Sequence, residues 1–218
     1  MDKEALELII REFVEELVAL IAEAKSDEQP KKEEEPGKLS TRALLELVYH
    51  EGIVKEAYKD SVGVWTWGVG VTNSSGHSVY PRYKDNPATI RRVLEVFKWL
   101  VETRYLPPVI SAFKGVALTE SQLAAAVSFH YNTGGINRAS WVKSYLNGDV
   151  GVAKRQFMNW RSPKEIIPRR EAERDLFFDG KWSGNGSATV YTRVRKPSYS
   201  PDWSSAERVD ISKELEGS

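Results

Sequence analysis

Glu51, Asp60 and Thr66 are the residues whose types and spacing point most directly to chemistry, because all three fall within sixteen consecutive residues. Two carboxylates that share one cleft are the minimum needed to hydrolyse a glycosidic bond. One carboxyl group protonates the leaving oxygen, and the other attacks the sugar or directs a water molecule. A threonine hydroxyl beside them can orient that water. Each residue alone is more often an ordinary polar side chain, but together with the neighbouring glycines they favour a hydrolytic site.

The segment that leads to Glu51 is predicted to be a helix over residues 40–51. Ser40 or Thr41 can cap its start, and Gly52 can end it. Glu51 then lies at the helix C-terminus, where the negative end of the macrodipole disfavours a carboxylate. This position favours the protonated form, which a general acid requires.

The segment after Asp60 is predicted to be a pair of strands. Side chains alternate between the two faces of a strand, so Trp65 and Trp67 should share one face and Thr66 should lie on the other. The glycines at positions 68 and 70 fall on the face of Thr66 and leave room beside its hydroxyl for a sugar or a water. The alternative interpretation is a hairpin whose glycines serve only its turns and its twist.

Two further segments are predicted to be helices of the same body. Val, Leu, Phe and Trp recur at helical spacing between about residues 87 and 105, and we expect this apolar stripe to be core. Thr119 and Gln122 form a capping box ahead of a helix that carries Phe129 and Tyr131.

Composition is typical of a soluble enzyme. The chain has 218 residues, of which 41% are hydrophobic, enough for one substantial core or two small lobes. It has no cysteine, which excludes disulfides, a thiol nucleophile and a cysteine-ligated metal. His50, His77 and His130 lie far apart and lack the spacing of metal ligands, so we expect neither a metal nor a cofactor.

The formal net charge is zero, but the charges are distributed unevenly along the chain. Residues 1–39 carry twelve acids and six bases, a balance of −6, and the remaining residues carry the opposite balance of +6. A basic body suits an anionic polymer such as the bacterial cell wall. The excess is too modest to indicate nucleic acid, and a merely solvated surface is the alternative.

Four parts follow from these patterns: an amphipathic helix over residues 1–24, a charged linker with proline over 25–39, a catalytic domain over 40–182, and a tail rich in Ser, Gly and Pro over 183–218. The tail contains one strand-like stretch, residues 188–194, and could wrap the body or hang free.

The N-terminal helix is the part that the chemistry does not explain. Its acidic start and Glu12, Glu15 and Glu16 argue against a signal peptide and against a membrane span. Its acidic polar face disfavours an anionic membrane surface. Self-association, docking on the body and binding of a partner remain open, although barely three heptads is short for a coiled coil.

The run Glu51-Gly52, then Tyr58-Lys59-Asp60, then Gly63-Val64-Trp65-Thr66-Trp67-Gly68-Val69-Gly70 resembles the motif of the phage lysozymes, glycoside hydrolase family 24. Glu51, Asp60 and Thr66 match the three catalytic positions of that family with unbroken spacing. Residues 127–134 look like its inter-lobe segment, and Trp160 and residues 168–174 look like its C-terminal helices. The resemblance covers about residues 40–182. One departure is Val71, where many family members have a histidine that is usually structural.

The resemblance implies the lysozyme-like α+β fold, a mostly helical lobe with a small antiparallel sheet lobe. It also implies hydrolysis of the β-1,4 bond between N-acetylmuramic acid and N-acetylglucosamine in peptidoglycan. Glu51 would be the acid, and Asp60 and Thr66 would hold the attacking water on the opposite face, which gives inversion. Arg170 matches the family arginine that faces the catalytic glutamate, so we expect it to pair with Glu51 and tune its pKa; a solvated helix start is the alternative for this arginine.

Five residues are expected from the same resemblance to border the substrate, each with packing or capping as the alternative: Thr72, Tyr131, Asn132, Ser140 and Trp141.

Two other functions remain open at the level of sequence. A lytic transglycosylase cuts the same bond with one acid and no water, and the presence of both Asp60 and Thr66 argues against it. A phage structural or wall-binding protein with the same fold is harder to separate. With no recognisable signal peptide, we expect synthesis in the host cytoplasm and action on the wall after membrane disruption, with no stable membrane insertion.

Overall fold

Helix α2 (Thr41–Glu51) begins and ends where the sequence predicts. The side chain of Ser40 accepts a hydrogen bond from the backbone N–H of Ala43 at 3.0 Å. Gly52 ends the helix with a φ of 75°, a conformation that glycine adopts without a steric penalty. Glu51 is therefore the last residue of α2, and the chain leaves it directly into a strand.

The computed structural model describes residues 38–215. The amphipathic helix predicted over residues 1–24 and nearly all of the linker predicted over 25–39 lie outside the described residues. Within the described part, no helix is long and apolar enough to cross a membrane.

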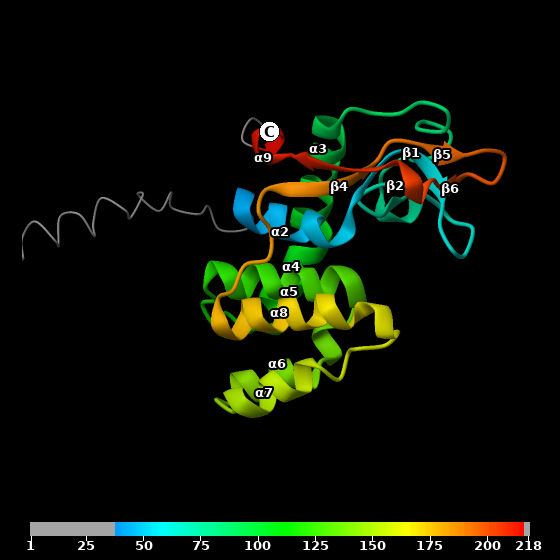
Figure 1. Cartoon of the computed structure of the whole chain (residues 1–218). Coiled ribbons are helices and arrows are strands. Elements are labelled where there is room, and N and C mark those ends of the chain that lie inside the picture. The colour runs from blue at the N-terminus through cyan, green and yellow to red at the C-terminus, as the bar shows by residue number, and fades with distance from the viewer. Residues whose placement is uncertain (1–37, 216–218) are drawn as a thin grey trace, which may run out of the picture. The chain divides into compact units, whose positions relative to one another are not determined.

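A five-stranded sheet with the order β3-β2-β1-β4-β7 forms one part of the described body (Figure 1). A separate two-stranded ribbon pairs β5 with β6. The strands are β1 (Ile53–Lys59), β2 (Trp65–Gly68), β3 (Val71–Thr72), β4 (Ser187–Tyr191), β5 (Val194–Arg195), β6 (Ser200–Pro201) and β7 (Ala206–Asp210).

The sheet is mixed rather than purely antiparallel, which corrects one detail of the predicted fold. Strands β1, β2 and β3 form the expected antiparallel meander. Strand β4 then returns from far along the chain and pairs with β1 in parallel, with Ile53 opposite Val190. Residues 183–215 are thus not a loose tail, because β4 and β7 extend the same sheet.

The helices after α2 are α3 (Ile90–Leu100), α4 (Leu106–Ala112), α5 (Glu120–Thr133), α6 (Ser140–Leu146), α7 (Val150–Phe157), α8 (Ile167–Asp179) and α9 (Ser212–Leu215). Helices α4, α5 and α8 stack below the sheet and α6 and α7 lie beyond them, whereas α3 and α9 lie beside the strands (Figure 1). A π-helical segment, Val101–Tyr105, joins α3 to α4. The predicted capping box of α5 is present, since Thr119 and Gln122 cap each other.

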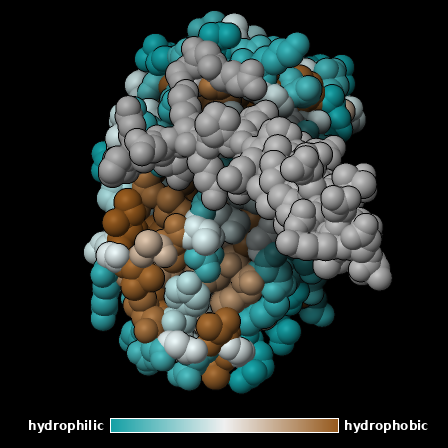
Figure 2. All heavy atoms as spheres, turned by 90° about the vertical axis from the view of Figure 1, so that its left-hand side faces the viewer, coloured by the Kyte–Doolittle hydropathy of each residue, from teal (hydrophilic) through white to brown (hydrophobic). Residues whose placement is uncertain are grey.

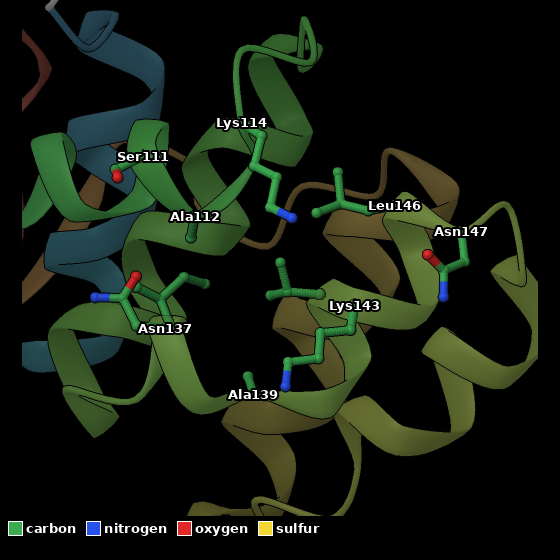
Figure 3. Close-up of a pocket in the computed structure, with 10 residues that line it drawn as sticks. Ser111, Ala112, Lys114, Asn137, Ala139, Lys143, Leu146 and Asn147 are labelled. Carbon is green, nitrogen blue, oxygen red and sulfur yellow. The ribbon is translucent and has the colours of Figure 1, made fainter.

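The helical core is built from stacked aromatic rings. Trp141 is fully buried, with its ring centroid 4.6 Å from that of Phe157 and 5.0 Å from that of Phe177. Apolar atoms also gather on the lower half of one outer face, framed by hydrophilic atoms (Figure 2). A hollow of about 460 Å³ lies beside α4 and α6, with Lys114 and Lys143 at its margin (Figure 3). None of the predicted catalytic residues lines this hollow.

Glu46 fastens the segment after α8 to helix α2. Its buried carboxylate accepts hydrogen bonds from the backbone N–H of Ser183 at 3.1 Å and of Gly184 at 2.7 Å. His50 Nε2 lies 3.4 Å from the same carboxylate. Burial alone raises the pKa of Glu46, but the close approach of His50 and the hydrogen bonds from Gly184 and Ser183 outweigh burial and hold the pKa below its ordinary 4.5. The charged carboxylate of Glu46 therefore anchors the segment that leads into the C-terminal strands.

We expect this contact to make folding stability depend on acid pH. A carboxyl group whose folded pKa is depressed stabilises the fold above its unfolded pKa, and that stabilisation is lost as the pH falls through the folded value. The melting temperature of the wild type should thus fall more steeply than that of Glu46→Gln between about pH 5 and about pH 3. Thermal melts across this range measure it, and parallel curves for the two proteins would contradict the role of Glu46.

Candidate active site

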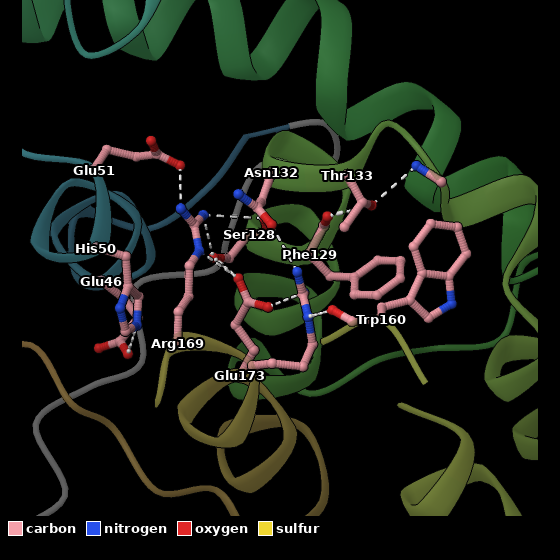
Figure 4. A network of polar contacts seen from close by, with 12 residues as sticks. Glu46, His50, Glu51, Ser128, Phe129, Asn132, Thr133, Trp160, Arg169 and Glu173 are labelled. Carbon is pink, nitrogen blue, oxygen red and sulfur yellow. Dashed lines mark hydrogen bonds and ion pairs between the residues drawn. The ribbon is translucent and has the colours of Figure 1, made fainter. Parts of the chain in front are cut away.

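Glu51 lies at the junction of α2 and β1, and its side chain is 21% exposed. One carboxylate oxygen, Oε1, accepts a short hydrogen bond from Nη1 of Arg169, which comes from α8 (Figure 4). The guanidinium is almost fully buried, whereas the carboxylate keeps access to solvent. The buried guanidinium of Arg169 therefore fixes the Glu51 carboxylate, which remains partly exposed and accessible to a ligand.

Asp60 and Thr66 are joined through a single residue of the turn between β1 and β2. Asp60 Oδ1 accepts hydrogen bonds from the backbone N–H groups of Val62 at 3.0 Å and Val64 at 2.8 Å. The hydroxyl of Thr66 donates to the carbonyl of Val64 at 3.1 Å. Because that hydroxyl donates to the backbone, its oxygen lone pairs are left to accept a hydrogen bond from water.

Tyr58 links the acid to this turn. It pairs across the strands with Thr66 and comes two residues before Asp60. Burial is the main reason that the pKa of Tyr58 is raised to about 12, and the negative charges of Glu51 and Asp60 add to it. The phenol of Tyr58 is thus within the electrostatic influence of both carboxylates, and its strand position is directly opposite Thr66.

A buried ion network supports Glu51 from the helical side (Figure 4). Glu173 Oε1 accepts from Arg169 Nε at 2.9 Å and from the hydroxyl of Ser128 at 2.6 Å. Its other oxygen accepts a short hydrogen bond from Arg170 Nη1. Burial opposes the charge of Arg169, but Glu51 and Glu173 outweigh burial and raise its pKa. Two guanidinium groups and two carboxylates therefore balance one another.

The prediction that Arg170 pairs with Glu51 is wrong, because Arg169 makes that contact. Arg170 is fully buried instead and donates to Asn132 Oδ1 at 2.6 Å and to the carbonyl of Trp160 at 3.0 Å. The two arginines are neighbours on α8, and successive helical residues point about 100° apart.

Thr72 lies on β3 directly opposite Thr66, so it borders the same face of the sheet. Its hydroxyl is 2.7 Å from that of Ser74 and 3.2 Å from that of Ser75. Thr72 thus helps to form the turn after β3, and its contact with substrate stays a prediction.

Tyr131 connects the helical part to the sheet. Its hydroxyl donates a short hydrogen bond to the backbone carbonyl of Val69. Its ring lies 4.5 Å from that of Tyr105, centroid to centroid. Burial, followed by the charge of Glu51, raises the pKa of Tyr131 well above its ordinary value, so the hydroxyl remains a donor. The hydroxyl is occupied by the protein itself, and only the ring is left for the predicted contact with substrate.

We expect Tyr131→Phe to loosen this connection without changing the core. The variant keeps the ring but removes the hydrogen bond from the hydroxyl to the carbonyl of Val69, at an expected loss of about 1–3 kcal/mol in the free energy of unfolding. Urea unfolding measures the loss. Tyr80→Phe, on a tyrosine that is 42% exposed, is the matched control and should stay within about 0.5 kcal/mol of wild type. Equal stability of the two variants would contradict the idea that this hydrogen bond stabilises the connection between the helical part and the sheet.

Asn132 lies in a groove of about 600 Å³ beside the ion network. The groove is also lined by Thr133, Trp160, Glu165 and Arg170. Its amide, hydroxyl and indole groups are suited to hydrogen bonds with, and stacking against, a sugar or a peptide. Asn132 therefore remains a candidate for substrate binding.

Of the last two predicted substrate contacts, only one is accessible. Ser140 is exposed at the start of α6, and its contact with substrate stays a prediction. Trp141 is fully buried among aromatic rings of the helical core, so the prediction that it contacts substrate is wrong. An apolar ring next to a helix start gives no sequence signal that separates a cleft wall from a core.

Three residues of the site had no individual role in the sequence analysis: Tyr58, Arg169 and Glu173. Tyr58 stands in the motif two residues before Asp60, and that position is the signal that could have pointed to it. Glu173 follows Arg169 by four residues and Arg170 by three, the spacings at which helical side chains meet. Among residues 38–215, no group of His, Cys, Asp and Glu side chains is arranged to hold a metal ion.

The chain is similar to known proteins in both sequence and fold. The sequence model of the family described as phage lysozyme matches residues 48–173. The endolysin of Salmonella phage P22 is 31% identical over 147 residues, which cover 64% of this chain and 97% of that protein. The endolysin of Acyrthosiphon pisum secondary endosymbiont phage 1 is 26% identical over 150 residues, with the same coverage. The crystal structure of a P22 lysozyme variant superposes with a TM-score of 0.55, at 24% identity and over 64% of this chain and 97% of that one.

Proposed function

This chain belongs to the phage lysozyme family, and from that premise we propose that it cleaves the β-1,4 bond between N-acetylmuramic acid and N-acetylglucosamine in peptidoglycan. Its activity is that of a peptidoglycan-hydrolysing lysozyme, a glycosidase. The observation that carries the proposal is the difference between the two carboxylates. Glu51 is backed by a buried arginine, whereas Asp60 is held in a turn together with a threonine hydroxyl.

Glu51 is the proposed general acid. Its proton passes to the glycosidic oxygen while the bond from that oxygen to the anomeric carbon breaks. Glu51 is left as a carboxylate, and Arg169 compensates the negative charge that has just appeared. Glu173 holds this guanidinium in place through Nε, so the compensating charge is already oriented before the reaction.

Asp60 and Thr66 are proposed to position and activate the attacking water. The lone pairs of the Thr66 oxygen accept one hydrogen bond from the water, and Asp60 accepts the proton that the water loses as it attacks. Attack from the face opposite the leaving group inverts the anomeric configuration. The two backbone N–H groups that bind Asp60 Oδ1 fix the orientation of this carboxylate within the turn.

Analysis of the products tests the reaction type. Digestion of purified Gram-negative peptidoglycan in ¹⁸O-labelled water should give reducing muramic acid ends that carry the label, and NMR at early times should show the inverted anomer. Anhydromuramic ends would instead identify a lytic transglycosylase. A trapped covalent bond between Asp60 and the sugar would overturn inversion. Binding without cleavage would indicate a wall-binding protein.

The wider setting belongs to the same proposal. The proposed partner is bacterial peptidoglycan, an anionic polymer suited to the +6 balance of the residues after position 39. The enzyme would be made in the host cytoplasm and reach the wall after membrane disruption. Self-association or partner binding through residues 1–24 is proposed as well, and light scattering of the full chain beside a chain that starts at residue 38 would test it.

A further inference from the structure

The C-terminal strands reach the catalytic turn although they lie outside the family match. That match ends at residue 173, whereas β5 and β6 form a hairpin between residues 194 and 201. The backbone N–H of Lys59, the last residue of β1, donates to the carbonyl of Tyr199 in this hairpin at 2.7 Å. The hairpin therefore makes contact one residue before Asp60.

Tyr199 holds both sides of the turn that carries Asp60. Lys59 ends β1 and Trp65 begins β2, and the two residues pair with each other at the base of this turn. The carbonyl of Tyr199 binds Lys59, and its ring meets the indole of Trp65 edge-on, with centroids 5.0 Å apart and planes at 66°. Thr66 follows Trp65 directly, so the same contact reaches the third catalytic residue.

The ring of Tyr199 is itself fixed by polar contacts. Its hydroxyl donates to the carboxylate of Asp85 at 3.1 Å. Asp85 also forms a short ion pair with Lys196, and Lys196 lies 3.2 Å from Glu56 on β1. The hairpin is thus tied to β1 through its backbone, through the ring and through these charges.

The turn has little packing of its own. Val62 is 80% exposed and Val64 is 45% exposed, so apolar burial does not fix the turn. Segments with few buried contacts open easily unless something else holds them. Hydrogen bonds within the turn fix Asp60 relative to the turn, so the position of the whole turn on the sheet depends on the residues at its base.

The backbone of Tyr199 is in a conformation that favours glycine. Its φ is +58°, in the left-handed region, where a side chain is strained. Glycine would adopt this conformation without strain and would complete the hairpin equally well. A strained residue persists where the surrounding structure holds it in place, as is common at functional sites. The contacts of the ring are therefore what a glycine at this position would lack.

We propose that Tyr199 is a positioning residue, which orients the Asp60 turn through Lys59 and Trp65 and makes the C-terminal hairpin a working part of the active site. This inference rests on the role proposed above for Asp60. A misplacement of about 1 Å in a reacting group can lower the rate about 10²-fold, so a clamp at the base of the turn acts on the chemical step.

Three variants of the full chain test the proposal. Tyr199→Gly removes the ring and also relaxes the strained backbone, so it is not expected to unfold the protein. Tyr199→Phe keeps the ring and removes the hydroxyl that donates to Asp85. Trp203→Ala is the matched control, because Trp203 lies in the same extension and its ring meets that of Tyr191 edge-on with centroids 5.0 Å apart.

Two readouts are measured for each variant: kcat and KM on soluble peptidoglycan fragments, and amide hydrogen exchange of residues 58–66. For Tyr199→Gly we expect kcat to fall roughly 10- to 100-fold with KM nearly unchanged, and the amides of Val62 and Val64 to exchange faster. Trp203→Ala should match wild type in both readouts, and Tyr199→Phe, which keeps the ring but not its bond to Asp85, should lie between wild type and Tyr199→Gly.

Two results would overturn the clamp: wild-type kcat and exchange in Tyr199→Gly, or equal losses in Tyr199→Gly and Trp203→Ala, which would mean general destabilisation. Inactivity of the wild type itself would overturn the proposed function instead. The exchange measurement would still decide whether Tyr199 holds the turn.

Discussion

Glu51→Gln is expected to lower kcat on peptidoglycan by roughly 10²- to 10⁴-fold, the usual contribution of a positioned general acid. The amide has the shape of the carboxylic acid and can still accept the hydrogen bond from Arg169, but it has no proton to give to the leaving oxygen. The loss should therefore appear in kcat, with binding of the glycan largely retained. Turbidity clearing and the release of reducing ends measure it.

A matched control separates this chemistry from a loss of charge. Glu95→Gln also removes one carboxylate from a helix, where Glu95 lies 3.1 Å from Arg92 and is 40% exposed. We expect this variant to retain wild-type activity and stability, because exposed ion pairs contribute only about 0–1 kcal/mol. If Glu51→Gln keeps kcat within tenfold of wild type, another group supplies the proton and the assignment of Glu51 fails.

Glu173→Gln is expected to lower the free energy of unfolding by about 3–5 kcal/mol, because it leaves two buried guanidinium groups without their shared counter-charge. Glu173 and Arg170 are each about 1% exposed and Arg169 is 9% exposed, so water cannot replace the lost carboxylate. The amide oxygen can accept only part of the hydrogen bonds that the two carboxylate oxygens accept now. Urea unfolding followed by tryptophan fluorescence measures the change.

Glu171→Gln is the control for this prediction, since Glu171 lies on the same helix and is exposed. It should change stability by no more than about 0.5 kcal/mol. Because Glu173 also orients Arg169 behind Glu51, the remaining folded Glu173→Gln protein should have a lower kcat as well. A stability loss below about 1 kcal/mol would mean that the network relaxes or admits water, and that its charges are not truly buried.

The amino-acid sequence by itself determined the parts of this protein that depend on neighbouring residues. The cap at Ser40, the end of α2 at Gly52 and the capping box at Thr119 all follow from hydrogen bonds that span three or four residues. The family also follows from sequence, since the motif from Glu51 to Gly70 has a spacing that local structure preserves. Such features are read directly along the chain.

Tertiary structure alone decided which distant residues meet. The sequence does not reveal that Arg169 rather than Arg170 contacts Glu51, because both face partners on other elements and only the packing of α8 against α5 and α7 sets the rotation of the helix. The parallel pairing of β1 with β4 and the contact of Tyr199 with Lys59 join segments more than 130 residues apart. Such contacts depend on how the surfaces of different helices and strands pack together, and the residue pattern within one segment does not specify that packing.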